Sequence, residues 1–187
     1  MSKTRATVVY DAVGNAIVSI DPLGNRTTYG YDKLNRWEAT HDAFGGRVTA
    51  VHDAVGNAIA GIDQLGYRTT YSYDTLDRHV ETLDALGGRA TAVYDAVGNV
   101  TVTINQLGAR TTYTNDALGR MTAMQDALGN RTTAVYDAVG DMIRVIDARG
   151  STTTIAYDVL HRATTVTDAL GGVSTVAFDV VGNLKTR

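Results

Sequence analysis

The stretch YDAVGN stands at residues 10–15 and decides the fold, because it returns every 42 residues with small changes. Its further copies are HDAVGN (52–57), YDAVGN (94–99), YDAVGD (136–141) and FDVVGN (178–183). A catalytic site needs one nucleophile or base in one place, whereas a stack of structural units needs one motif many times. The recurrence therefore predicts a tandem-repeat protein.

An acidic residue at alternating steps of ten and eleven residues defines the repeat more finely. The period is 21 residues in two half-units, and slightly under nine copies fill the chain without a break in composition. This predicts a single repeat domain over residues 1–187. The 17 positions are Asp11, Asp21, Asp32, Asp42, Asp53, Asp63, Asp74, Asp84, Asp95, Asn105, Asp116, Asp126, Asp137, Asp147, Asp158, Asp168 and Asp179.

Three residues after these positions stands glycine in 14 of 17 cases, and Asn35, Asp77 and His161 in the others. All four residue types tolerate a positive φ better than the rest, so the constraint concerns the backbone. D-x-x-G predicts a type I turn that ends in a G1 bulge, with the aspartate side chain bonding the following amides. The turn residues that we single out as structural sites are Asp11, Gly14, Asp32, Asn35, Asp53, Gly56, Asp95, Gly98, Asp137 and Gly140.

Stretches of about six residues separate the turns, such as AIVSI (16–20) and RTTYGY (26–31). They are rich in β-branched and aromatic residues, which favour strands. Strand and tight turn in regular alternation predict an all-β antiparallel array of hairpins, with about 18 short strands and no room for helices.

Two sets of residues share one face of the predicted sheet, because side chains two apart on a strand point the same way. Four residues before the aspartate stand Thr7, Thr28, Thr49, Thr70, Thr91, Thr112, Thr133, Thr154 and Thr175. Six residues before it stand Arg5, Arg26, Arg47, Arg68, Arg89, Arg110 and Arg131. We expect this Arg/Thr face to be wet, and the opposite face to carry a ladder of tyrosine and aliphatic side chains.

Larger and smaller side chains alternate on the tyrosine face, as Tyr29, Ala50, Tyr71 and Ala92 show. This alternation doubles the true period to 42 residues and predicts that neighbouring hairpins interlock. The turn tips, such as Val13 and Leu23, are apolar, so we expect them to contact each other or another layer.

Charge and composition exclude several classes of partner. The net charge of −3 argues against general binding of nucleic acid. Without cysteine there is no disulfide and no thiolate metal site. No apolar run approaches the roughly 18 residues of a membrane-spanning helix, and the first residues lack the apolar core of a signal peptide, so we expect no membrane insertion. The compartment stays open.

The motif Y-D-x-x-G-[NR] at 21-residue spacing resembles the YD repeat of Rhs proteins, Tc toxin complexes and teneurins. It is carried by YDAVGN, YDKLNR (31–36), YDTLDR (73–78), NDALGR (115–120) and YDVLHR (157–162), and it covers essentially the whole chain. The resemblance implies a continuous antiparallel sheet that spirals into a hollow shell, which in bacterial toxins encloses a C-terminal toxin. It also implies a bacterial secreted or cell-surface system.

The chain departs from the family toxins in length and in the segments that it carries. It has fewer repeats, and DPLG (21–24) matches only the turn pattern of its own copy, not a self-cleavage region. About 18 strands spaced about 4.8 Å apart make a sheet on the order of 85 Å wide. Such a sheet must curl into a spiral or barrel-like shell, or its open edges must pair with another copy.

No constellation of residues predicts an enzyme, a cofactor or a metal site. The four histidines, His41, His52, His79 and His161, stand at different places in the repeat and do not converge. The turn aspartates are an alternative calcium site, but turn capping explains them sufficiently. The few serines stand in no nucleophile context.

We therefore predict a structural repeat module that forms a hollow β-sheet shell or scaffold. The alternative is an adhesive module that binds carbohydrate or a surface. We expect self-association through the open edge strands, and polypeptide cargo or other shell segments as partners. The arginines that could face cargo or an anionic glycan, or that simply solvate the sheet, are Arg26, Arg47, Arg68, Arg89, Arg110 and Arg131.

Overall fold

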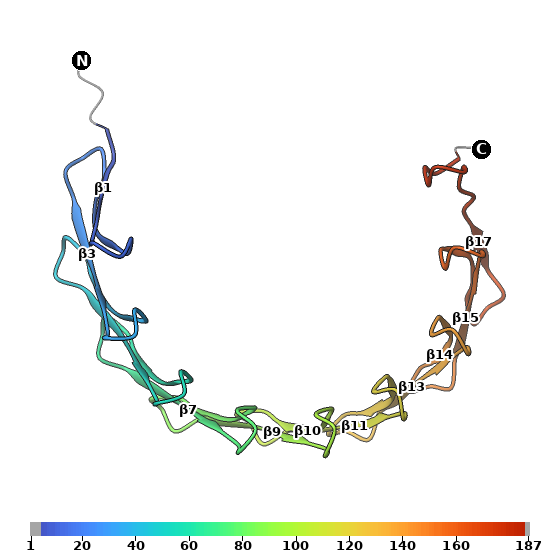
Figure 1. Cartoon of the computed structure of the whole chain (residues 1–187). Coiled ribbons are helices and arrows are strands. Elements are labelled where there is room, and N and C mark those ends of the chain that lie inside the picture. Colours follow the sequence, from blue (N-terminus) through green and yellow to red (C-terminus); the bar gives the residue numbers. More distant parts are fainter. Residues whose placement is uncertain (1–4, 186–187) are drawn as a thin grey trace. The chain divides into compact units, whose positions relative to one another are not determined.

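The computed structural model describes residues 5–185, and strands and tight turns make up this part of the chain. It contains 17 β-strands and no helix. The predicted all-β class is confirmed, since the β-branched stretches between the turns are strands throughout (Figure 1). Arg5 precedes the first strand.

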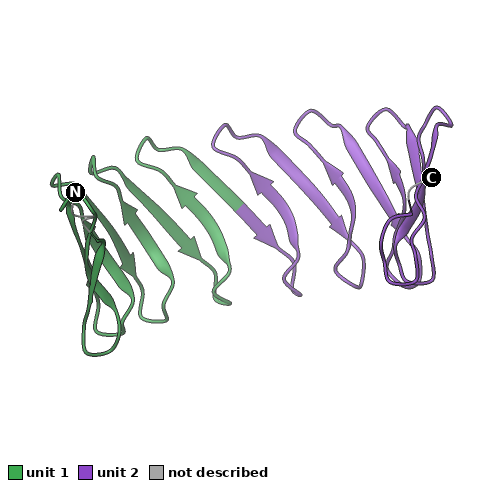
Figure 2. Ribbon diagram, turned by 90° about the horizontal axis from the view of Figure 1, so that it is seen from above, with its two compact units in different colours: residues 1–91 green, residues 92–187 purple. Residues whose placement is uncertain are grey.

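The chain divides into two compact units, one ending at Thr91 and the other beginning at Ala92 (Figure 2). The division lies within strand β9 (Arg89–Tyr94). The first unit holds β1 (Thr7–Tyr10), β2 (Ala16–Ile20), β3 (Arg26–Tyr31), β4 (Trp37–His41), β5 (Arg47–His52), β6 (Ala58–Ile62), β7 (Arg68–Tyr73) and β8 (His79–Leu83). The second holds β10 (Val100–Ile104), β11 (Arg110–Asn115), β12 (Met121–Gln125), β13 (Arg131–Tyr136), β14 (Met142–Ile146), β15 (Thr152–Tyr157), β16 (Ala163–Thr167) and β17 (Val173–Thr175).

Within each unit, every strand pairs antiparallel with the strand that follows it in the chain. The β2–β3 pair aligns Val18 with Thr28, and the β12–β13 pair aligns Ala123 with Thr133. Within each unit, the hairpins that begin with β1, β3, β5, β7, β11, β13 and β15 each carry one register shift, as between Val9 and Tyr10 opposite β2. In these seven hairpins the bulge lies beside the turn that follows the odd-numbered strand, so we call the edge of each unit that carries these turns the YD edge.

The backbone at the turns has the conformation that the spacing predicts. All 14 glycines of the repeat have φ between 77° and 114°. Asn35, Asp77 and His161 occupy the same left-handed region, with φ of 60°, 57° and 59°. Amide nitrogens three residues after the first turn position donate back to its carbonyl, as from Gly24 to Asp21 at 3.0 Å. The turns are thus type I turns closed by a left-handed residue.

Each unit is a single layer, and burial within it is slight. Among the described residues, the buried hydrophobic side chains are three alanines, Ala39, Ala60 and Ala123. They pair with Thr49, Thr70 and Thr133, so they lie at the centre of the Arg/Thr face. The prediction of a wet Arg/Thr face is therefore wrong at these three central positions, where a small methyl group lies beside a larger threonine of the next strand.

Packing on the tyrosine face gives part of the reason for the 42-residue period. The hydroxyl of Tyr29 lies 3.0 Å from Oγ of Ser19, and that of Tyr113 lies 3.3 Å from Oγ1 of Thr103. Tyr71 has the same relation to Gly61, whose added Cβ would lie 3.9 Å from the tyrosine hydroxyl. In the structure, each of these tyrosines thus lies beside a small residue of the preceding strand.

The apolar turn tips are exposed within each unit. Sixteen of the 17 tip positions carry an apolar side chain, and these are 60–97% exposed. Apart from Val97 at 84%, the tips at the YD edge, such as Leu34 at 64%, are less exposed than those at the opposite edge, such as Leu107 at 92%. Contact of the tips with another layer stays a prediction.

Candidate functional site

The turn aspartates of the YD edge organise the turns through their carboxylates. Oδ1 accepts hydrogen bonds from the amides two and four residues later, at 2.8 Å and 3.0 Å in the turn of Asp32. Asp11, Asp53, Asp95 and Asp137 make the same two bonds, and Gly14, Asn35, Gly56, Gly98 and Gly140 are the left-handed residues of these five turns. The ten residues thus occupy equivalent positions in five turns of the YD edge.

Two kinds of turn alternate along the YD edge, and they differ at the fifth residue. Arginine turns have Arg36, Arg78, Arg120 or Arg162 at that position. Asparagine turns have Asn15, Asn57, Asn99, Asp141 or Asn183. In both kinds the side chain meets Oδ2 of the turn's own aspartate where a donor is present, at 2.6 Å from Arg36 Nε and 2.9 Å from Asn15 Nδ2.

The arginine turns reach forward to the next hairpin. Nη1 of Arg36 donates to the carbonyl oxygen of Asp53 at 2.8 Å, and Nη1 of Arg120 donates to that of Asp137 at 3.3 Å. Arg162 makes the equivalent bond to Asp179 at 3.4 Å. The guanidinium of Arg120 also lies 4.7 Å from the ring centroid of Tyr136, which is a cation–π contact. One arginine thus joins its own turn to the next.

The asparagine turns reach forward differently, to the left-handed residue of the next turn. Nδ2 of Asn15 donates to Oδ1 of Asn35 at 3.2 Å, and Nδ2 of Asn57 donates to Oδ1 of Asp77 at 2.9 Å. Further along, Oδ2 of Asp141 lies 2.8 Å from Nδ1 of His161. The three exceptions to glycine are therefore not only tolerated by the backbone, because their side chains also receive a contact from the preceding hairpin.

The tyrosines of the YD motif have a role that the sequence pattern did not reveal. Hydroxyls of Tyr31, Tyr73, Tyr136 and Tyr157 donate to backbone carbonyls 15 residues earlier, at 3.0–3.1 Å. These carbonyls belong to the bulge residues, where the strand ladder is interrupted. Asn115 replaces tyrosine in one copy and donates from Nδ2 to Val100 at 3.0 Å. That replacement, which keeps a donor, was the signal available in the sequence.

Acid should destabilise the chain by protonating the turn aspartates at both edges of the sheet. Hydrogen bonds from the Asn25 side chain and backbone lower the pKa of Asp21, and those of the Arg78 side chain and backbone lower the pKa of Asp74. Because the folded-state pKa lies below the unfolded one, the unfolded chain takes up protons first as the pH falls. From these aspartates we expect little change in the midpoint temperature between about pH 5 and pH 6, and a steady fall below about pH 4. A level midpoint down to pH 3 in thermal scans would contradict this.

His161 should give the opposite pH dependence. Its hydrogen bond with Asp141, together with the charges of Asp141, Asp137 and Asp158, raises its pKa above 6.5. This contribution to stability is full below pH 6.5 and is lost as the pH rises through the raised pKa. We expect the midpoint temperature to fall between pH 6 and pH 8 by more in the native chain than in His161→Asn. Equal falls in the two proteins would contradict the link, and the other three histidines cancel in the comparison.

The arginine column of the Arg/Thr face lies at the other end of the odd-numbered strands. Arg26, Arg47, Arg68, Arg89, Arg110 and Arg131 each begin a strand and are exposed. Arg89 pairs with Glu81 at 3.1 Å, and within residues 5–185 no ion pair involves the other five. Within each unit, these arginines thus occupy the same position on successive odd-numbered strands.

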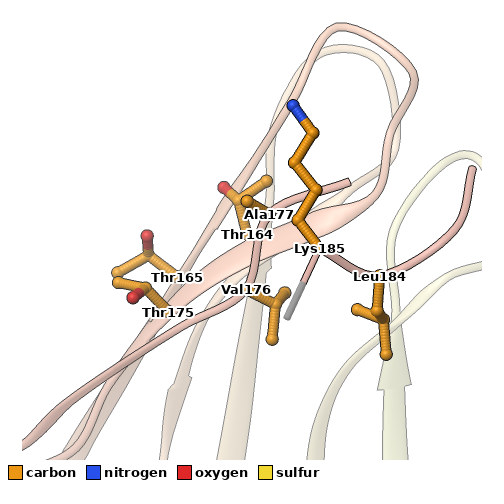
Figure 3. Close-up of a pocket in the computed structure, with 7 residues that line it drawn as sticks. All are labelled: Thr164, Thr165, Thr175, Val176, Ala177, Leu184 and Lys185. Carbon is orange, nitrogen blue, oxygen red and sulfur yellow. The ribbon is translucent and has the colours of Figure 1, made fainter. Parts of the chain in front are cut away.

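A hollow of about 640 Å³ lies at the last hairpin (Figure 3). Its described lining consists of Thr164, Thr165, Thr175, Val176, Ala177, Leu184 and Lys185. These residues include neither a carboxylate nor an imidazole, so they supply no acid–base pair.

No group of three potential metal ligands occurs between residues 5 and 185. In the same part of the chain, no helix is long and apolar enough to cross a membrane.

Comparison with known proteins links this geometry to one family. The family model for the RHS Repeat matches residues 10–48, 94–131 and 136–173, which make up more than half of the chain. No curated protein matches the chain.

A solved structure shares the fold of this chain. The crystal structure of TcdB2-TccC3-TEV superposes with a TM-score of 0.59 at 16% identity, over 97% of this chain and 13% of that chain. A structure of the Photorhabdus luminescens Tc holotoxin pore matches with a TM-score of 0.45 at 13% identity, over 98% of this chain and 15% of that one. The chain thus spans a small part of the proteins that it resembles. With hairpins of 21 residues, turns of D-x-x-G type and the matched family model, this chain belongs to the Rhs repeat family.

Proposed function

We propose that the chain is a wall segment of a structural shell or scaffold, whose sheet encloses or supports another polypeptide. The observation that carries the proposal is the single-layer sheet with three buried alanines among its described residues. A chain that buries so little of its own surface is suited to be part of a wall rather than a globule with an internal site. The likeness in fold to a Tc toxin complex supports the same role.

The proposal includes the partners and the organisation of the chain. Single-layer sheets end in edge strands with unpaired amides and carbonyls, so other shell segments or a second copy should add there. Polypeptide cargo would contact one of the half-buried faces. We also propose one repeat domain over residues 1–187. Its support is that the hairpins of both compact units follow one sequence pattern.

Small-angle X-ray scattering on the purified chain tests whether it has the extended or hollow shape of a shell segment. A filled globule of 187 residues has a radius of gyration of about 16 Å. We expect a clearly larger value and a profile of a thin or hollow object, with the mass given by the forward scattering. A compact filled particle of monomer mass would overturn the proposal.

An adhesive module remains a second candidate because of the arginine column. Guanidinium groups at every second strand lie roughly 10 Å apart, since adjacent strands are about 4.8 Å apart. Such a row suits an extended polyanion such as a sulfated glycan.

A pair of double variants separates adhesion from a purely structural role. If the column binds sulfated glycan, Arg47→Ser with Arg68→Ser should weaken binding to a heparin column. Lys33→Ser with Arg149→Ser removes the same charge outside the column and should leave retention nearly unchanged. Equal losses of heparin retention in the two double variants would mean that binding depends on net charge alone, and would reject the arginine column as a site.

A further inference from the structure

The turn between β6 and β7 differs from its two counterparts, which lie 42 residues before and after it in the repeat. The counterparts are the turns between β2 and β3 and between β10 and β11. Three positions in and beside the turn differ together. They carry Gly61, Asp63 and Tyr67 here, Ser19, Asp21 and Asn25 in the earlier counterpart, and Thr103, Asn105 and Ala109 in the later one.

Gly61 leaves the hydroxyl of Tyr71 without a partner. In the counterparts, the hydroxyls of Ser19 and Thr103 lie 3.0 Å and 3.3 Å from those of the equivalent tyrosines. Gly61 offers no such group, and no hydrogen bond of the Tyr71 hydroxyl occurs within residues 5–185. The glycine also leaves space, because only an added Cβ would approach this hydroxyl, at 3.9 Å.

Tyr67 leaves one oxygen of the Asp63 carboxylate open. Oδ1 of Asp63 accepts hydrogen bonds from the amides of Leu65 and Tyr67, both at 2.9 Å. In the earlier counterpart, Nδ2 of Asn25 donates to Oδ2 of Asp21 at 2.7 Å. Tyr67 takes the place of that asparagine, and among the described residues nothing donates to Oδ2 of Asp63. This oxygen is an open anionic acceptor.

Two hollows within the first unit share Tyr67 and Thr69. The first, of about 240 Å³, is lined by both of these residues, by Gly61, Asp63 and Tyr71, and by two aliphatic side chains. The second, of about 330 Å³, is lined by the same two residues together with Asp84, Ala85 and Leu86. Tyr67 is 53% exposed, so its ring is a wall that a ligand can reach. We call the first hollow the Tyr67 site.

The polar groups of the Tyr67 site suit a cation with several N–H donors. The Asp63 carboxylate only accepts hydrogen bonds, and the Thr69 and Tyr71 hydroxyls can accept them. No basic side chain is among the described residues that line either hollow. Arg47 lines a separate hollow with Asp63 and makes no ion pair within residues 5–185. Tyrosine rings also attract a cation to their faces.

The second unit contains the same combination of groups with a guanidinium in place. Nη2 of Arg120 lies 2.6 Å from Oδ2 of Asp116, and Cζ lies 4.7 Å from the ring centroid of Tyr136. Arg162 likewise pairs with the aspartate of its own turn and covers the Phe178 ring at 4.4 Å. A guanidinium between an aspartate Oδ2 and an aromatic ring is thus an arrangement that this protein already forms.

We propose that the Tyr67 site binds the guanidinium group of an arginine side chain from a partner polypeptide. The guanidinium pairs with Oδ2 of Asp63, stacks on the Tyr67 ring and donates to the Tyr71 hydroxyl. A volume of about 240 Å³ is below the roughly 300–1,000 Å³ of small-molecule pockets, and it suits one long side chain. In an extended partner, the side chain two residues away lies against Ala85 and Leu86.

This inference goes beyond a wall or an adhesive module. The arginine column offers cations on the Arg/Thr face, whereas the Tyr67 site takes a cation on the tyrosine face. The site can bind an arginine side chain whether or not the chain encloses anything, so this proposal and the proposed function fail separately.

A capped arginine tests the site directly. N-acetyl-arginine methylamide is titrated into the full chain, and NMR follows the amide shifts of Gly61, Tyr67 and Thr69. The control is the capped citrulline, in which a neutral urea replaces the guanidinium at nearly the same shape. We expect saturable shifts with arginine and binding at least about fivefold weaker with citrulline. Equal affinities, no saturable shift, or equal shifts at Thr103 and Thr111 of the later counterpart would overturn the proposal.

Variants that copy the counterparts should remove the site and keep the fold. Asp63→Asn reproduces Asn105, whose Oδ1 accepts the same two amide bonds at 3.0 Å and 2.9 Å. Tyr67→Ala reproduces Ala109, and Gly61→Ser supplies the serine of the earlier counterpart. Each change should weaken binding of the capped arginine by at least about threefold. Unchanged binding in Asp63→Asn or Tyr67→Ala would overturn the proposal.

Asp147→Asn is the control for charge, because Oδ1 of Asp147 makes the same two amide bonds in the second unit. This variant loses the same charge outside the Tyr67 site, so its binding of the capped arginine should equal that of the native chain. Equal weakening in Asp63→Asn and Asp147→Asn would show that net charge attracts the probe, and would overturn the proposal.

Two further probes show whether a polypeptide or a free guanidinium compound occupies the site. The peptide acetyl-Arg-Gly-Leu-amide can place its leucine against Ala85 and Leu86, whereas agmatine has the guanidinium alone. We expect the peptide to bind more tightly and to shift the amides of these two residues. Agmatine that binds as tightly as the peptide would reject a polypeptide as the occupant.

Discussion

Gly66→Val should lower the free energy of unfolding by about 2–3 kcal/mol. Gly66 has φ of 84°, and an added Cβ would meet no atom within 4 Å. The whole effect therefore comes from the backbone, because a β-branched residue is strongly disfavoured in the left-handed region. Urea denaturation followed by circular dichroism measures the change as a shift in midpoint.

Two matched variants show whether the backbone is the cause. Gly30→Ala adds a Cβ in extended backbone, 3.7 Å from the Cβ of Ala39, and should change stability by less than about 1 kcal/mol. Gly66→Asn should be milder than Gly66→Val, since Asn35 holds φ of 60° in an equivalent turn. Equal losses for Gly66→Val and Gly30→Ala would show that the left-handed position does not limit the choice of residue.

Arg120→Ser should cause the largest loss of stability among the arginine variants. The side chain makes a salt bridge to Asp116 at 2.6 Å, donates to the Asp137 carbonyl and covers the Tyr136 ring. Serine is too short to make any of these contacts, so the turn of Asp116 loses its tie to the next hairpin. We expect a fall of several degrees in the midpoint temperature of the chain.

Arg110→Ser is the matched control, because Arg110 begins β11 on the exposed column and has no ion pair within residues 5–185. Its midpoint temperature should stay close to that of the native chain. Hydrogen exchange should also separate the two, with faster exchange in β13 and its turn only for Arg120→Ser. Similar melting of both variants would mean that the forward contact of the arginine turns contributes nothing to stability.

The sequence by itself determined the local structure of this protein. A turn with a left-handed residue is specified within five residues, so Asp32 with Asn35, or Asp158 with His161, could be assigned from spacing and residue type. Strand direction followed from the distance between turns, since ten or eleven residues leave room for one short strand only. The family followed from the same spacing, and the matched family model agrees with it.

Only the tertiary structure decided how one hairpin holds the next. The pattern showed arginine and asparagine alternating at the YD edge, but not that Arg36 reaches the Asp53 carbonyl or that Tyr31 reaches the bulge carbonyl of Ala16. Nor did it show that Ala60 is covered on a face expected to be wet. The two hydrogen bonds join residues of separate hairpins, 17 and 15 positions apart, where the bulge and the reach of a long side chain decide which groups meet. Turn chemistry is local and can be predicted from sequence, whereas contacts between hairpins depend on positions that the folded sheet alone defines.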